Sequence, residues 1–287
     1  MPEEKEEGVE AARRRLARVG VVFLAALTGI SIQMYHLRAD GGLVSYVDSS
    51  RLAEGLERFR FDYALPNGKR GQIHAIFGDP KKVGFELVMN PERKPVAHVR
   101  TDAMVVANAA YFTPDFRPTG LLVSNGKTIS PFVRGAGGAG SGVFVLENGA
   151  IELLERDKVG TRSFGMATLA IQAGPRIIEP DGSRGIHRDD GTGAHRTVIG
   201  ADARGHLALA IIVGGSEPWA GPSLYETQLL LGPNGLGAER PELELRFALN
   251  LDGGPSSAIE VRHSSYRLSI AEGSPVLSIL ALSPIRP

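Results

Sequence analysis

Short apolar segments that end in turn residues run through most of this sequence, and they constrain its fold more than any other feature. "VSNGKTI" and "FVLENGAIEL" each place Asn-Gly between apolar residues, which is the strongest short-range signal for a β-hairpin. Apolar residues alternate with others along 59–65, just before "PNGK", and along 83–89, as in strands with one buried face. "RTVIGADARGHLALAIIVGG" predicts a longer hairpin that turns at 202–205. The chain should therefore be rich in paired strands.

One helix is clearly indicated, in "PSLYETQLLLGPNG". Ser223 can cap its N-terminus, Glu226 follows three residues later as in a capping box, and Gly232 with Pro233 ends it. A further helical turn is expected within 52–59. Because strands and helices do not alternate regularly, the predicted fold class is α+β, with strand-rich mixed or antiparallel sheets and a few packed helices.

The composition is ordinary for a globular chain of 287 residues, a length that fits one large domain. The 36 glycines and 18 prolines agree with many tight turns. Lys plus Arg number 32, as do Asp plus Glu, so no overall positive field would attract nucleic acid. The absence of cysteine from the sequence excludes disulfides, thiolate zinc sites and cysteine nucleophiles.

The N-terminal region predicts export. Arginines precede "VGVVFLAALTGISIQMYHL", an uncharged stretch of about 19 residues that would reach roughly 28 Å as a helix, close to the thickness of a membrane. The arginines should keep a cytoplasmic tail at 1–18 and place the rest of the chain outside, in the periplasm or the extracellular space. We expect a transmembrane anchor or signal peptide at 19–37, a linker at 38–57 and a single domain at 58–287. Cleavage of a signal peptide, for which only a weak site is present, would make the protein secreted.

Two glycine-rich stretches resemble nucleotide-binding motifs, but their context is wrong. "GAGGAG" at 135–140 fits G-x-G-x-x-G, yet "SGVFVLENG" follows it, which predicts a strand and hairpin instead of the helix that a dinucleotide site needs. "GLLVSNGKT" has five residues between its glycines, where a P-loop has four. G-x-S-x-G is also missing from the sequence, so a serine-hydrolase elbow has no support. No cofactor is expected.

Four predicted strands begin or end in abrupt clusters of polar and turn residues. A strand fixes the backbone while the loop at its end exposes side chains, so such positions often hold functional groups. If the four ends converge, they form a site. The candidates are Asn108 and Tyr111 in "AMVVANAAYF", Gln172 in "TLAIQAGPRII", His195 and Arg196 in "GAHRTVIG", and Asn250, Asp252, Gly253, Gly254 and Ser256 in "LRFALNLDGGPSS".

Each candidate also has an ordinary structural interpretation. Asn108, Asn250 and Asp252 are residue types typical of tight turns, and Arg196 could be an exposed surface cation. Glu226 already has a structural role in the predicted capping box. "HRDDGTGAH" contains possible metal ligands but is more typical of a solvated loop, so no metal site is assigned. The serines of "PSS" are interpreted as hydrogen-bond donors, because no adjacent base that would activate them is identifiable.

Taken in order, these segments resemble the phosphodiester glycosidase family. The matching features are "NAAYF", "RPTG", "QAGPRII", "RTVIG", "SLYETQLLL" and "NLDGGPSS", spread over 103–257, and the ordered set is more specific than any one of them. The resemblance implies an exported hydrolase that cleaves the bond between the anomeric carbon and the phosphate oxygen of a sugar-1-phosphodiester, in envelope or extracellular glycans. Pro255 stands where the family often has glycine or another small residue, so contacts of that backbone N–H are not carried over.

For this reaction, the resemblance implies catalytic roles for Asp252, Arg196 and Glu226. Asp252 would stabilise the oxocarbenium-like anomeric centre, attack it or activate water. Arg196 would hold the phosphate through its planar fork of donors, and Glu226 would be a second carboxylate. The residues expected to bind substrate are Asn108, Tyr111, Gln172, His195, Asn250, Gly253, Gly254 and Ser256.

The implied partner is a phosphodiester-linked sugar or glycan, with the membrane as a second partner through the N-terminal segment. An alternative hypothesis is a non-catalytic protein that binds glycans or helps to assemble exopolysaccharide, with the same pocket but no turnover. Release of free sugar from sugar-1-phosphodiesters distinguishes the two.

Overall fold

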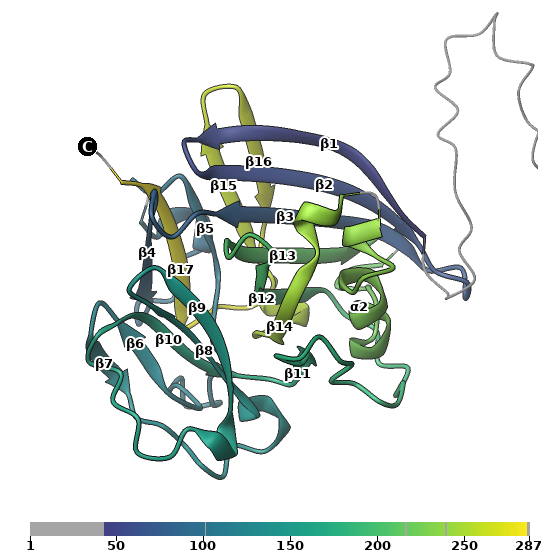
Figure 1. Ribbon diagram of the computed structural model, residues 1–287. Coiled ribbons are helices and arrows are strands. Elements are labelled where there is room, and N and C mark those ends of the chain that lie inside the picture. The colour runs from purple at the N-terminus through teal and green to yellow at the C-terminus, as the bar shows by residue number, and fades with distance from the viewer. Residues whose placement is uncertain (1–42, 101, 216, 239, 286–287) are drawn as a thin grey trace, which may run out of the picture. The chain divides into compact units, whose positions relative to one another are not determined.

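The computed structural model describes residues 43–100, 102–215, 217–238 and 240–285, and in these ranges the chain is mostly β (Figure 1). Its strands form three antiparallel sheets. The seven-stranded sheet has the order β1-β2-β3-β13-β12-β14-β11, with the bounds Leu43–Ala53, Leu56–Ala64, Arg70–Gly78, Leu207–Gly214, Arg196–Asp202, Leu245–Asn250 and Arg176–Ile178.

The two other sheets have five strands each. One has the order β7-β6-β10-β8-β9, with the bounds Lys127–Ser130, Leu122–Ser124, Ala167–Ala173, Gly142–Glu147 and Ala150–Glu155. The other has the order β16-β15-β5-β17-β4, with the bounds Tyr266–Ile270, Ile259–His263, Val105–Asn108, Ser278–Pro284 and Val83–Met89. Helix α2 spans Leu224–Leu231, and short 3-10 helices lie at Val96–His98, Gly138–Gly140, Arg156–Lys158, Leu236–Ala238, Pro241–Leu243 and Gly254–Ser256.

The central strands of the seven-stranded sheet are buried on both faces. In β13, Leu209 and Ile211 pack into a cluster shared with the two five-stranded sheets, whereas Ala210 and Ile212 pack into a second cluster on the opposite face. Successive side chains of a strand point to opposite faces, so an unbroken apolar run such as this one can fill two cores. Leu230 of α2 belongs to the second cluster, which places the helix on that face.

The predicted hairpins are confirmed. Asn125 and Gly126 join β6 to β7, and Asn148 and Gly149 join β8 to β9. All four residues have positive φ, from 49° to 74°, as a two-residue turn between twisted strands requires. The strand expected after "GAGGAG" is β8, so the rejection of a dinucleotide motif is consistent with the structure.

The helix at 224–231 is also confirmed, together with its capping box between Ser223 and Glu226. The fold class is only partly right. Within the described residues α2 is the one α-helix, and the sheets are antiparallel, so the fold is mostly β and the expected set of packed helices is not present there.

The expected linker at 38–57 is wrong from residue 43 onward, because β1 and the start of β2 occupy that part. The helical turn expected within 52–59 is a hairpin, in which Ala53 pairs with Leu56 and Gly55 has a φ of 73°. Leu52 and Leu56 do share one core cluster, but across the turn of a hairpin and not along a helix. Apolar residues four positions apart fit both a helical turn and a hairpin. Gly55 allows the positive φ that the hairpin turn needs.

The tail at 1–18 and the anchor or signal peptide at 19–37 lie outside the described residues. Among the helices that are described, none is long and apolar enough to cross a membrane.

Candidate active site

The four polar strand ends meet around the segment that follows β14. Backbone hydrogen bonds connect this segment to the end of β5, the end of β10 and the start of β12. The four bonds are Asp252 N to Ala109 O at 3.1 Å, Gly174 N to Asn250 O at 3.0 Å, Leu251 N to Thr197 O at 2.8 Å and Gly254 N to His195 O at 2.8 Å. The "NLDGG" segment is therefore fixed by three other parts of the chain, distant in sequence.

Asn108 lies under this segment and is fully buried. Its Nδ2 donates to the backbone oxygen of Asp252 at 2.7 Å, while its Oδ1 accepts from Thr197 Oγ1 at 2.8 Å and from the backbone N of Ala258 at 3.0 Å. Both acceptor positions of its amide oxygen are thus used within the protein. Asn108 positions the backbone of Asp252, and its contacts do not place it against substrate.

Thr197 was missed by the sequence analysis, and Ser257 was considered there only as a hydrogen-bond donor. Both are completely buried, and the two hydroxyls lie 3.0 Å apart, so that Ser257, Thr197 and Asn108 form a hydrogen-bonded chain beneath the segment. The signal for Thr197 was weak, because a threonine inside an apolar strand is a common residue in a structural position.

The carboxylate of Asp252 is partly buried and has few donors. Its Oδ1 accepts the backbone N–H of Gly253 at 3.0 Å, and the buried hydroxyl of Ser256 donates to the same carboxylate. Burial raises the pKa of Asp252 to about 6, against the opposing effect of the hydrogen bonds from Ser256 and Gly253. This acid changes its ionisation close to neutral pH, which is unusual for an aspartate and typical of groups at functional sites.

Tyr111 and Asn250 complete the surroundings of this acid. Asn250 Nδ2 donates to the hydroxyl of Tyr111 and to the backbone oxygen of Leu251, the latter at 2.8 Å. Burial raises the pKa of Tyr111, as does the negative charge of Asp252, while the positive charge of Arg196 opposes them. The phenol therefore stays protonated and lies within the fields of both the acid and the cation.

Asn250 also carries an unsatisfied group. Its Oδ1 is buried and has no hydrogen-bond partner among the described residues. Buried amide oxygens are almost always paired in folded proteins, and those that are not call for a specific explanation.

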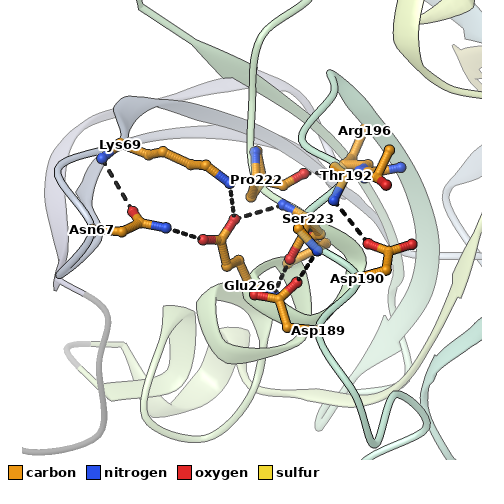
Figure 2. Close-up of polar contacts among 11 residues, drawn as sticks. Asn67, Lys69, Asp189, Asp190, Thr192, Arg196, Pro222, Ser223 and Glu226 are labelled. Atoms are coloured by element: carbon orange, nitrogen blue, oxygen red, sulfur yellow. Dashed lines mark hydrogen bonds and ion pairs between the residues drawn. The ribbon is translucent and has the colours of Figure 1, made fainter.

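Arg196 is not a surface cation, because only 9% of the residue is exposed. Figure 2 shows its contacts: Nε donates to the backbone oxygen of Pro222 at 3.0 Å and Nη2 to that of Thr192 at 2.5 Å. Nη1 makes no hydrogen bond to any described residue, so one edge of the guanidinium is anchored and the other is available. Burial lowers the pKa of Arg196, although the guanidinium remains charged near neutral pH.

Glu226 is placed differently from the second carboxylate that was expected. Its oxygens accept from Asn67 Nδ2, from Lys69 Nζ at 2.8 Å and from the backbone N of Ser223 at 2.7 Å (Figure 2). Burial opposes ionisation, but the hydrogen bonds from Lys69, Ser223 and Asn67 outweigh it and hold the pKa of Glu226 below its ordinary value. These contacts are those of a helix cap with an added ion pair, so the structural interpretation of Glu226 fits the geometry.

Gln172 is also used within the protein. Its Oε1 accepts from the backbone N of Leu121 and of Val133, each at 3.0 Å, and its Nε2 donates to the backbone oxygens of Val133 at 2.7 Å and Gly140 at 3.1 Å. All four hydrogen-bonding positions of the amide are filled. Gln172 fastens both ends of the glycine-rich loop at 135–140, and its contacts do not direct it to substrate.

In the loop at 187–195, two aspartates accept hydrogen bonds from the backbone of the same loop. Asp189 accepts from the backbone N of Gly191 at 3.0 Å, and Asp190 from that of Thr192 at 2.9 Å, and both aspartates are exposed. In the described part of the chain no group of three or more acidic or histidine side chains is arranged to hold a metal ion. The interpretation of this stretch as a solvated loop fits these contacts.

Gly253 and Gly254 are the last two residues of the segment, and His195 is joined to them through its backbone oxygen, which accepts the N–H of Gly254. The ring of His195 contacts that of Trp219, with centroids 5.4 Å apart and an interplanar angle of 73°. A Cβ on Gly253 would lie 3.1 Å from the backbone oxygen of His195, whereas Gly254 has a φ of 60°, a conformation that favours glycine. Glycine is thus favoured at position 254 by conformation and at 253 by close approach.

Comparison with known proteins identifies a family for most of the chain. A sequence model described as phosphodiester glycosidase matches residues 101–276, which include the "NLDGG" segment and the three parts of the chain that hold it. A comparison with curated proteins gives no match.

Two solved structures are similar to this chain. A hypothetical protein from Synechocystis shares 17% identity over 87% of this chain, with a TM-score of 0.51, and this chain covers 65% of that protein's length. A putative exported protein from Burkholderia pseudomallei K96243 shares 14% identity over 76% of this chain and 74% of its own, with a TM-score of 0.47. At these identities the first likeness concerns the fold alone.

Proposed function

Because this chain belongs to the phosphodiester glycosidase family, we propose that it hydrolyses the glycosidic bond of sugar-1-phosphodiesters, with Asp252 at the anomeric carbon. The observation that supports this assignment best is the environment of Asp252. It is a partly buried carboxylate with a pKa of about 6, held by four converging strand ends, and its charge is felt by a protonated tyrosine that also feels the charge of the anchored Arg196.

The reaction breaks the bond between the sugar's C1 and the phosphate oxygen, and water supplies the new oxygen on C1. The leaving group is a phosphate monoester, which is already a stable anion and needs its charge held more than it needs a proton. The available edge of Arg196 suits this purpose, because a guanidinium donates in a planar fork to two phosphate oxygens. Tyr111, which stays protonated, would donate to a third oxygen of the same group.

Asp252 acts on the anomeric carbon as its ionised carboxylate. It can attack C1 and form a covalent intermediate, or it can take a proton from the water that attacks C1. The first route releases a sugar with retained configuration at C1, and the second route releases a sugar with inverted configuration. Glu226 has no part in this proposal, since its oxygens are engaged in the helix cap and with Lys69.

We further propose, from the N-terminal sequence, that the protein is exported and remains anchored in the membrane, so that it meets phosphodiester-linked glycans of the envelope or the extracellular space. Protease treatment of spheroplasts, from which any outer membrane has been removed, tests the location: a domain outside the cytoplasm is degraded, and one inside is protected.

The activity is tested by incubating the full-length protein with methyl phosphodiesters of hexose and N-acetylhexosamine 1-phosphates and measuring free sugar. Release of sugar that Asp252→Asn abolishes supports the proposal. Asp181→Asn is the matched control, because Asp181 is an exposed aspartate that caps a turn near Ser183 and should be dispensable. Binding of a diester without release would support the glycan-binding alternative instead.

A further inference from the structure

The single tryptophan of the chain has an unusual backbone conformation. Trp219 lies in the loop between β13 and α2, is partly buried, and has a φ of 63°. Asn125 and Asn148 also have positive φ, but they lie in Asn-Gly turns, where this conformation is expected. A bulky aromatic residue is found in the left-handed region only when its surroundings fix it there, and such residues are concentrated at binding and active sites.

The surroundings of Trp219 do fix it. Its backbone oxygen accepts the N–H of His195 at 2.8 Å, and the backbone oxygen of Ala220 accepts the N–H of Gly214 at 2.7 Å. The indole also covers Gly273, in the loop between β16 and β17, so closely that a Cβ there would lie 2.1 Å from Cζ2 of the ring. The indole thus contacts His195, directly before β12 of the seven-stranded sheet, and Gly273, between β16 and β17 of a five-stranded sheet.

His195 and Gly273, the two residues that Trp219 contacts, are both hydrogen-bonded to the turn that follows Asp252. The backbone oxygen of His195 accepts the N–H of Gly254 at 2.8 Å, and that of Pro255 accepts the N–H of Gly273 at 2.6 Å. Trp219 therefore touches two residues that are hydrogen-bonded directly to the segment carrying the acid. No atom lies within 4 Å of the place where a Cβ on Gly254 would be, so there is space beside this turn.

The ring of His195 adds a polar group to this surface. Its Nδ1 is buried without a hydrogen-bond partner in the described residues, and burial lowers the pKa of the imidazole. The neutral tautomer that leaves a lone pair on Nδ1 carries its proton on Nε2, which makes no hydrogen bond to a described residue and is available as a donor.

We propose that Trp219 and His195 form a sugar subsite next to Asp252, in which the indole stacks on the apolar face of the pyranose ring and Nε2 of His195 donates to one of its hydroxyls. The inference rests on the proposed function and assigns the recognition of the sugar to two residues that do not take part in bond cleavage. A half-buried tryptophan fixed beside a polar donor suits a ligand with one apolar face and a rim of hydroxyls.

The tryptophan itself reports on the subsite, because no other residue of the chain contributes tryptophan fluorescence. The experiment titrates full-length Asp252→Asn, which should bind without turnover, with the same methyl phosphodiesters while calorimetry follows binding. We expect a saturable change in tryptophan emission whose midpoint equals the midpoint measured by calorimetry. Bound diester should also protect the indole from quenching by acrylamide. If calorimetry shows that the diester binds but neither the tryptophan emission nor its quenching by acrylamide changes, the proposed subsite is wrong.

Variants in the active background give a second measurement. Trp219→Ala should raise KM about 10-fold or more, the effect of losing one stacked aromatic contact, with a smaller change in kcat, while Trp219→Phe retains most of the affinity. Gly273→Ala should act in the same direction by displacing the indole, although Gly273 touches no substrate. Tyr266→Ala, which removes another partly buried ring that covers Arg58 on β2, is the matched control and should leave KM unchanged.

The two levels of the proposal fail differently. If no phosphodiester is bound or cleaved by the unaltered chain, the proposed function fails, and the subsite fails with it. If diesters are cleaved in an Asp252-dependent way but KM is unchanged in both Trp219→Ala and Gly273→Ala, the subsite alone is wrong.

Discussion

Glu226, in the first turn of α2, and Asp252, in the segment that follows β14, are two poorly exposed carboxylates whose surroundings have opposite effects. Glu226 accepts from a lysine, an amide and a backbone N–H, and its pKa is lowered. Asp252 accepts from one backbone N–H and one serine, and its pKa rises to about 6. Burial acts against the charge in both cases, so the donors decide the outcome. A fully engaged carboxylate strengthens the fold, and an under-engaged one keeps reactivity.

Arg196 lies between the two regions. Its charge is felt by Tyr111, beside Asp252, and it is itself influenced by Glu226. The guanidinium is anchored by the backbone oxygen of Pro222, which directly precedes the capped helix. The region around Glu226 therefore supports a cation that serves the region around Asp252. The difference between the carboxylates therefore predicts different losses on mutation.

The largest expected effect separates the two acids by activity. Asp252→Asn should lower kcat at least about 1000-fold, because the amide can neither attack the anomeric carbon nor accept a proton from water. Glu226→Gln should change kcat by less than about 5-fold, since a capping carboxylate does not touch the reacting atoms. Steady-state kinetics on a cleavable diester measures both. Equal losses in the two variants would break the comparison.

Arg196→Lys comes next, with an expected loss of about 100-fold in kcat/KM. An ammonium preserves the charge but cannot donate to Pro222, to Thr192 and to two phosphate oxygens at the same time. The variant should remain folded by circular dichroism. Unchanged kcat/KM would move the phosphate contact to another residue and would leave Arg196 with a purely structural role.

Asp252→Asn should also stabilise the protein at neutral pH, by up to about 3 kcal/mol. The folded protein holds the proton of Asp252 up to a pKa of about 6, against the ordinary aspartate value of 3.8, so the folded state loses stability as pH rises between these values. The amide does not titrate. Denaturant unfolding should therefore show the gain at pH 7.5 and not at pH 3.5, and a gain that is independent of pH would contradict the assigned pKa.

The sequence was informative where local chemistry determines structure. The Asn-Gly hairpins, the helix at 224–231 and its capping box depend on neighbours within a few residues, and each is present. The hairpin at Gly55 was mistaken for a helical turn, because apolar spacing of four residues fits both.

The site was only partly predictable for a related reason. Strand ends with polar residues could be identified as a set, and four of them do meet. What each side chain does there depends on partners far away in sequence. Gln172 is engaged by Val133 and Gly140, and Asn108 by Thr197, which no local pattern indicates.

The smallest expected effect sharpens the comparison most, because its dependence on pH has the opposite sign. Glu226→Gln should destabilise the protein by about 1 kcal/mol at neutral pH, since Gln can still accept from Ser223 but loses the ion pair with the partly exposed Lys69. The folded protein holds the pKa of Glu226 below its ordinary value, so its contribution is present above that ordinary value and is lost as pH falls through the lowered one. Unfolding curves of the two variants against pH should thus diverge: Asp252→Asn gains stability over the unaltered chain as pH rises, and Glu226→Gln loses it. If both variants shifted in the same direction, the donors around each carboxylate would not be what separates a structural acid from a reactive one.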